Sequence, residues 1–176
     1  HDALPISLSL FLGSIAGLKF GKLPDRIISL GSLITTSIPE FASGVVLIVI
    51  FANWLKLLPP LSIFVTENSI LESPSKLIMP VMVLALIETG YVTRMTRTSV
   101  VDVTKSAYVR AAMLRGIPYW PWVFKHVLRN ALLAPITVIL LHANWMIGGI
   151  VIIEATFGYP GLGNMLLDAT LNKDIN

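Results

Sequence analysis

Few side chains in this sequence are suited to chemistry, and four of them interrupt long apolar runs. These four are Glu40, Glu88, His142 and Asn144. A charged group at the centre of a bilayer costs roughly 2.5 to 3.5 kcal/mol on insertion scales, so an ionisable residue inside an apolar run indicates a function or a specific partner. Such groups either contact a solute or form hydrogen bonds between helices. Glu88 is expected to reach Arg94 or a neighbouring helix.

The usual signatures of catalysis are missing from the sequence. It contains no cysteine, which excludes disulfides, thiolate metal sites and cysteine nucleophiles. Gly21-Lys22 is followed by Leu23, and Ala16 stands where a phosphate-binding loop needs its first glycine. There is no His-Glu-x-x-His motif. We therefore expect no catalytic residue, no metal site and no cofactor bound by this chain.

The composition is that of a membrane protein. Of 176 residues, 55% are hydrophobic and 13% are charged, with a mean hydropathy of +0.78. Soluble domains carry roughly 25% charged residues. These values exclude a disordered chain and disfavour a soluble domain. The net charge of +3 alone would suit a nucleic-acid partner, but the distribution of the cations described below points to a membrane instead, and we expect no nucleic acid.

Four apolar runs predict an all-α, polytopic membrane helix bundle. A bilayer core of about 30 Å needs roughly 20 apolar residues in a helix. The second run is too long for one crossing, and Ser37-Ile38-Pro39-Glu40 inside it reads as a helix start, with Ser37 as N-cap and Glu40 reaching back to complete a capping box. Residues 27–36 then form a separate short helix or a kinked extension. The expected spans cover residues 3–18, 38–55, 77–93 and 131–153.

The chain ends suggest a fragment. The sequence begins at His1 without a methionine or the basic segment that opens a signal peptide. We expect the first apolar run to have lost its beginning and the protein to continue past Asn176.

The basic residues alternate from one predicted loop to the next. Ten lie in the first and third loops, and three lie in the other two. Loops rich in Lys and Arg remain in the cytoplasm. A buried core in a soluble bundle would explain the apolar runs but not this alternation, so we expect a multi-pass protein with two cytoplasmic basic loops. The ten are Lys19, Lys22, Arg26, Arg94, Arg97, Lys105, Arg110, Arg115, Lys125 and Arg129.

The second basic loop, residues 94–130, is long and partly apolar. Apolar residues at helical spacing predict an amphipathic helix from Ser99 to Arg115. Gly116 ends this helix because glycine adopts the left-handed cap conformation. A second short helix is predicted from Trp120 to Asn130. A helix, a glycine turn and a second helix below the membrane make a docking element.

Several stretches of the sequence resemble one family. Tyr108-Val109-Arg110-Ala111-Ala112, Gly116 and the stretch from Lys125 to Leu132 resemble the cytoplasmic EAA-motif loop of ABC-importer permeases, in the dipeptide, oligopeptide and nickel branch. Ser37-Ile38-Pro39-Glu40-Phe41 is similar to a segment of that branch, and so is the stretch from Gly148 to Gly163. The resemblance covers the chain from about Leu8 onward. In the motif that names the loop, Arg110 replaces the glutamate, a replacement associated with the peptide branch.

The resemblance implies a type I permease fold and an ATP-driven importer. A second permease subunit, homologous or identical, would complete a pore in the lipid bilayer. Cytoplasmic ATPase subunits would bind ATP-Mg, and an extracytoplasmic binding protein would deliver the solute. The implied loop residues for ATPase coupling are Tyr108, Arg110, Ala111, Ala112, Gly116 and Trp120. Arg110 and Arg115 either pair with carboxylates on the ATPase or follow the positive-inside rule.

The resemblance also implies two further groups of residues. His142, Asn144 and Glu88 are candidates for lining the translocation path, with hydrogen bonds between helices as the alternative. His142 and Asn144 lie on different helical faces, and Gly149 permits close helix packing on the His142 face. The external segment acts as a gate near the binding protein or as a lid over the helix ends. Its residues are Glu154, Pro160, Gly161 and Gly163.

Three functions remain open on the sequence. The first is a permease of a bacterial or archaeal plasma membrane that carries peptides, nickel chelates or another small solute. The second is a gradient-driven transporter that uses Glu40, Glu88 or His142 as a proton relay. The third is a scaffold that transports nothing.

Overall fold

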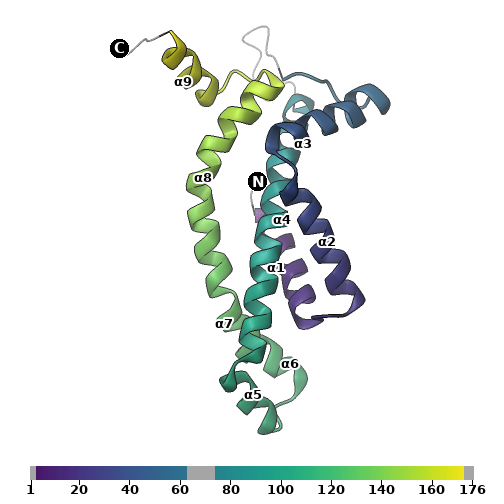
Figure 1. Cartoon of the computed structure of the whole chain (residues 1–176), viewed down its shortest axis with the longest axis vertical. Coiled ribbons are helices and arrows are strands. Elements are labelled where there is room, and N and C mark those ends of the chain that lie inside the picture. The colour runs from purple at the N-terminus through teal and green to yellow at the C-terminus, as the bar shows by residue number, and fades with distance from the viewer. Residues whose placement is uncertain (1–2, 63–73, 173–176) are drawn as a thin grey trace. The chain divides into compact units, whose positions relative to one another are not determined.

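All regular elements in the described part of the chain are helices. The computed structural model describes residues 3–62 and 74–172, and Figure 1 shows their arrangement. The predicted all-α fold is confirmed. The elements are α1 (Ala3–Leu18), α2 (Leu23–Ser37), α3 (Glu40–Leu47), the π-helical segment Ile48–Trp54, α4 (Ser75–Lys105), α5 (Ala107–Leu114), α6 (Tyr119–Pro121), the π-helical segment Trp122–Leu128, α7 (Arg129–Ala131), α8 (Leu133–Phe157) and α9 (Leu162–Leu171).

The chain folds as two compact units. Unit 1 consists of His1–Ser37 and Leu86–His142, and unit 2 consists of Ile38–Ala85 and Ala143–Asn176. Helices α4 and α8 contribute residues to both units. Each unit is described by itself below.

Two helices in the described residues are long and apolar enough to cross a membrane. They are Ser75–Lys105 and Tyr119–His142, and up to four crossings result if each of two bent helix pairs counts as one. A helix satisfies all its backbone hydrogen bonds internally, which is what an apolar run needs in lipid. The four predicted spans and the cytoplasmic side of residues 94–130 stay predictions.

The second apolar run divides at Pro39, but the predicted capping box is wrong. Ser37 is the last residue of α2, and Pro39 is the N-cap of α3 without a side-chain hydrogen bond. Glu40 does not reach back: a Cβ built on Gly149 of α8 would lie 2.8 Å from Oε2 of Glu40. The carboxyl group of Glu40 therefore packs against α8, and packing overrides the local capping pattern.

The predicted helix from Ser99 to Arg115 is also two helices. Helix α4 continues to Lys105, and Ser106 takes an extended conformation with φ −64° and ψ 148°. The Ser106 hydroxyl accepts a hydrogen bond from the Val109 amide at 3.4 Å. This N-cap starts α5 in a new direction, because an extended residue cannot continue a helix. The second predicted helix is present from Tyr119 to Ala131, but it is not a separate short helix, because it runs on to His142.

Small residues let α1 approach α4 closely inside unit 1. A Cβ on Gly13 would lie 2.5 Å from Cβ of Thr96, and one on Gly17 would lie 2.6 Å from Cβ of Val100. Close backbone approach at glycine is the usual way for apolar helices to pack in lipid. Helix α4 is thus held along one side and leads directly into the loop that carries α5.

Candidate functional site

The loop between α4 and α8 has a hydrophobic core of its own, which we call the loop core. It joins the end of α4 to α5, to the π-helical segment Trp122–Leu128 and to α7, all within unit 1. A second link is the Ser99 hydroxyl, which donates to the Ala131 carbonyl at 2.6 Å. The loop is therefore a packed structure and not a flexible linker. The loop core consists of Val100, Val109, Ala112, Trp122, Val123, Val127 and Ala131.

Two local features fix the position of α5. The Trp122 indole N–H donates to the Val109 carbonyl at 3.2 Å, which ties the π-helical segment Trp122–Leu128 to α5. Gly116 has φ +73°, the left-handed conformation expected of a glycine that ends a helix. The predicted turn at Gly116 is confirmed. The open space around Gly116 shows that backbone conformation, not crowding, selects glycine there.

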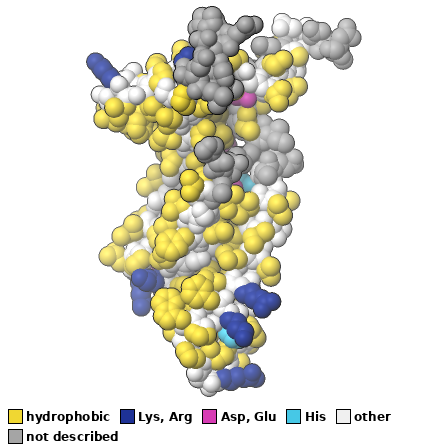
Figure 2. All heavy atoms as spheres, turned by 180° about the vertical axis from the view of Figure 1, so that it is seen from behind, with side chains coloured by type: hydrophobic (Ala, Val, Ile, Leu, Met, Phe, Trp, Pro, Cys, Tyr) yellow, Lys and Arg dark blue, Asp and Glu magenta, His cyan; other side chains and the backbone are white. Residues whose placement is uncertain are grey.

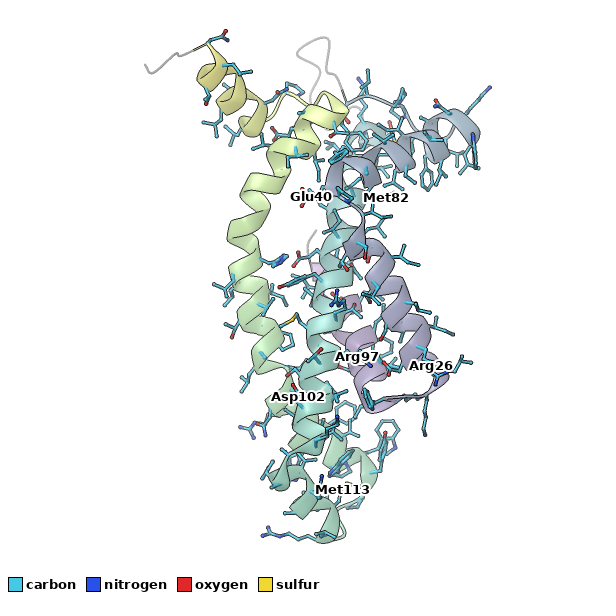
Figure 3. The ribbon with its side chains drawn as sticks, viewed as in Figure 1. Arg26, Glu40, Met82, Arg97, Asp102 and Met113 are labelled. Carbon is cyan, nitrogen blue, oxygen red and sulfur yellow. The ribbon has the colours of Figure 1, made fainter. Side chains whose placement is uncertain are left out.

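The other face of α5 is exposed. Leu114 is 86% exposed, and Met113, Arg110 and Ala111 are exposed beside it. Figure 3 shows Met113 on this helix, and Figure 2 shows Lys and Arg side chains among hydrophobic ones at the same end of unit 1. An open, shallow depression on this face is lined by Lys105, Ala107, Arg110, Ala111 and Leu114. Such a mixture of small, apolar and basic side chains suits contact with a protein groove.

The predicted coupling residues divide between the two faces of the loop. Arg110, Ala111 and Gly116 lie exposed, whereas Ala112 is buried in the loop core and positions α5. Tyr108 is exposed, and its hydroxyl lies 2.6 Å from Nδ1 of His126. This hydrogen bond ties α5 to the π-helical segment Trp122–Leu128 a second time.

The aromatic residues of the turn also divide. Trp122 is buried, while Tyr119, Trp120 and Phe124 are exposed. Trp120 stacks on Phe124 with ring centroids 5.9 Å apart. Residues two positions from Trp122 point to nearly the opposite side of the helix, so the stacked rings face away from α5.

The structure brings two candidate pathway residues together in unit 1. Nδ1 of His142 lies 3.0 Å from Oε2 of Glu88, and their side chains are 17% and 12% exposed. The ring of Tyr91 stacks on His142 with centroids 4.0 Å apart. Glu88 reaches the neighbouring helix, not Arg94, which donates to the hydroxyl of Thr36. The side chain of Asn144, the third candidate, lies outside the described residues.

In unit 2, the predicted external residues converge on Glu154. Its Oε2 accepts a hydrogen bond from the Asn164 amide at 2.8 Å, and its side chain is buried. A Cβ on Gly161 would clash with this carboxylate, and one on Gly163 would lie 2.8 Å from it. Pro160 precedes these glycines in the turn between α8 and α9. The carboxylate fills the space that the two glycines leave, and it caps the start of α9.

Comparison with known proteins identifies the family. Residues 9–176 match the family described as the binding-protein-dependent transport system inner membrane component. The chain belongs to this family. Its family is an inner membrane component of transport systems. The two long apolar helices found among the described residues are consistent with an integral membrane protein.

Curated members of the family carry peptide-transport names. The chain is 31% identical over 171 residues to a probable peptide ABC transporter permease protein of Sinorhizobium fredii, covering 97% of this chain and 55% of that one. It is 33% identical over 188 residues to the di/tripeptide transport system permease protein DppB of Pseudomonas aeruginosa, covering 96% and 56%. It is 34% identical over 173 residues to the oligopeptide transport system permease protein AppB of Bacillus subtilis, covering 97% and 55%. The chain thus spans little more than half the length of these relatives.

Sequence reasoning about this family member missed two features of the site. It named Glu88 and His142 separately, because the two residues lie on different helices and are 54 positions apart in sequence. The pairing could have been predicted from the presence of an acidic and a basic side chain in two different apolar runs. A pair of this kind lowers the free-energy cost of burying either group in a membrane. Nothing in the sequence singles out Tyr91, which lies one turn from Glu88.

Proposed function

We propose that this protein is the membrane-spanning permease subunit of an ATP-driven ABC importer, with α5 as the helix that docks on a cytoplasmic ATPase. The observation that carries the proposal is the packed loop between two apolar helices, which presents the exposed face of α5. Membership of a transport-system family supports it.

The packing of the loop gives a physical route for coupling. A helix that docks in a groove transmits force to the membrane when it is rigidly joined to the spanning helices. The loop core joins α5 to the end of α4, and the bond from Ser99 to Ala131 joins α4 to α7. Movement of α5 therefore moves α4 and the start of α8 together. Arg110 and Lys105 beside the depression favour a docking groove with acidic side chains.

The remaining parts of the machine belong to other chains. A second permease subunit completes the pore, ATPase subunits hold ATP-Mg, and an extracytoplasmic binding protein delivers cargo. The subunit itself is not an enzyme. Its place is the plasma membrane of a bacterium or archaeon, and the names of its relatives favour peptides as cargo.

Reconstitution tests the proposal. The full-length protein is incorporated into proteoliposomes with its second permease subunit, ATPase subunits and binding protein, and uptake of a labelled dipeptide is measured. We expect uptake that requires ATP and survives collapse of the ion gradients by an ionophore. Uptake that ATP does not support would refute the proposal.

The contact between Glu88 and His142 favours a second candidate, a gradient-driven transporter in which this pair relays protons. The same experiment separates the two functions, because proton-driven uptake is abolished by the ionophore and needs no ATP. The packed loop has no role in that alternative.

A further inference from the structure

Glu88, Tyr91 and His142 form a compact polar cluster on two helices of unit 1. Glu88 and Tyr91 lie on α4, and His142 lies on α8. Nδ1 of His142 lies 3.0 Å from Oε2 of Glu88, within hydrogen-bond distance. The imidazole is held between this carboxylate and the ring of Tyr91. The three side chains are therefore fixed relative to one another.

The cluster belongs to the interior of the assembled protein and not to the lipid surface. Both helices that carry it are long and apolar enough to span a membrane. Ionisable groups in such helices face the bundle interior or a water-filled cavity, because exposure to lipid costs several kcal/mol. The side chains of Glu88 and His142 are partly exposed in this chain, and Tyr91 is 36% exposed. None of the three side chains is fully buried within this chain.

The charge of the cluster selects its ligand. The cluster contains one acidic side chain, Glu88, and no Lys or Arg. A carboxylate has two oxygens, and the bond to His142 uses one of them. The other oxygen can accept a hydrogen bond from an ammonium group, and the positive charge of the donor strengthens such a bond. An anionic or neutral group gains nothing comparable at this position.

We propose that Glu88, His142 and Tyr91 form a recognition site for the ammonium group of the cargo, with Glu88 as the charged contact, His142 as the residue that orients it and Tyr91 as the ring that packs on the imidazole of His142. This inference rests on the proposed function, because the cargo is the solute that the importer carries. It adds a selectivity element within the membrane subunit, separate from any selection by a binding protein.

Direct binding to the membrane complex tests the site without transport. The intact complex, purified without binding protein in lipid nanodiscs, is titrated with glycyl-phenylalanine amide, a cation without a carboxylate. The matched probe is N-acetyl-glycyl-phenylalanine amide, which has the same shape but no charge. We expect the cationic probe to bind with a Kd between roughly 10 µM and 10 mM, and about tenfold more tightly than the acetylated one.

Substitutions assign the effect to the cluster. Glu88→Gln keeps the shape and an oxygen that accepts from His142, so the fold is retained, and it should weaken the cationic probe about tenfold without affecting the acetylated one. Glu88→Asp should retain most of the preference. Asp102→Asn removes the same charge from an exposed position further along α4, shown in Figure 3, and should change neither affinity. Thermal unfolding of each variant confirms that the fold is intact.

Three results would overturn the inference. They are equal binding of the two probes by the wild-type complex, an unchanged preference in Glu88→Gln, and an equal loss in Asp102→Asn. The uptake experiment tests the importer independently of the ammonium site. A binding preference without ATP-driven uptake would refute the importer and leave the ammonium site, whereas ATP-driven uptake without the preference would refute the ammonium site alone.

Discussion

Single residues determine the geometry of the turn after α8. Glu154 points its carboxylate to the start of α9, where the Asn164 amide donates to it. The helix segments Gly148–Phe157 and Leu162–Leu171 are bent by 97° at this turn. The glycines at 161 and 163 are needed because the carboxylate and the α8 backbone occupy the space of a side chain.

Gly163→Ala is expected to destabilise the protein by about 1 to 3 kcal/mol through overpacking. Its Cβ would lie 2.8 Å from Cα of Val151, a backbone atom that cannot move away without moving α8. Thermal unfolding in detergent measures the effect. Gly148→Ala is the control, since a Cβ there meets nothing within 4 Å, and alanine in a helix should be neutral or slightly stabilising. Equal melting temperatures for the two variants would contradict the packing account.

At the scale of elements, local sequence patterns predict a turn or a helix correctly where backbone conformation alone determines it. The turn at Gly116 and the second helix of the loop follow from glycine and proline positions and from apolar spacing. The break at Ser106 was missed because one serine in an amphipathic pattern does not show whether its hydroxyl caps a new helix. The role of Glu40 was missed because its partner surface on α8 is more than 100 residues away in sequence.

Gly116→Val is expected to uncouple ATP hydrolysis from transport while leaving membrane insertion intact. A β-branched residue at φ +73° strains the backbone by about 1 to 2 kcal/mol or more, so the end of α5 must rearrange. The ratio of ATP hydrolysed to peptide taken up measures coupling in proteoliposomes. Gly116→Asn should preserve it, because asparagine tolerates the left-handed conformation. Undiminished coupling in the valine variant would show that α5 does not transmit force.

At the scale of the whole molecule, each unit depends on contacts between segments distant in sequence. In unit 1, the start of α2 is joined to α4 by Arg97, whose Nε and Nη2 donate to the two oxygens of Asp25 at 2.5 and 2.9 Å. The Gly21 amide and the Ser29 hydroxyl donate to the same carboxylate. The sequence assigned Arg97 to the cytoplasmic charge bias and gave no sign of this pairing. Charge counts give orientation, whereas a specific pair depends on how the helices pack.

Breaking the ion pair between Asp25 and Arg97 by removing only the cation should strongly destabilise unit 1. The Asp25 side chain is 4% exposed, so Arg97→Ala leaves a buried carboxylate without its cation and should cost about 3 to 5 kcal/mol. Arg97→Lys keeps the charge but loses the bidentate geometry, and it should destabilise the protein less than Arg97→Ala does. Asp25→Asn, which removes the charge that needs compensation, should be milder than Arg97→Ala.

A double mutant separates the pair from its surroundings. Asp25→Arg with Arg97→Asp should recover part of the stability of the two single reversals, but not all of it, because the Gly21 amide then faces a guanidinium instead of a carboxylate. Thermal unfolding of the four proteins gives the interaction energy. If the double reversal adds the two single costs without recovery, the ion pair does not join α2 to α4 in the membrane-embedded protein. A clear recovery means that α2 moves with α4, and therefore with the loop that carries α5.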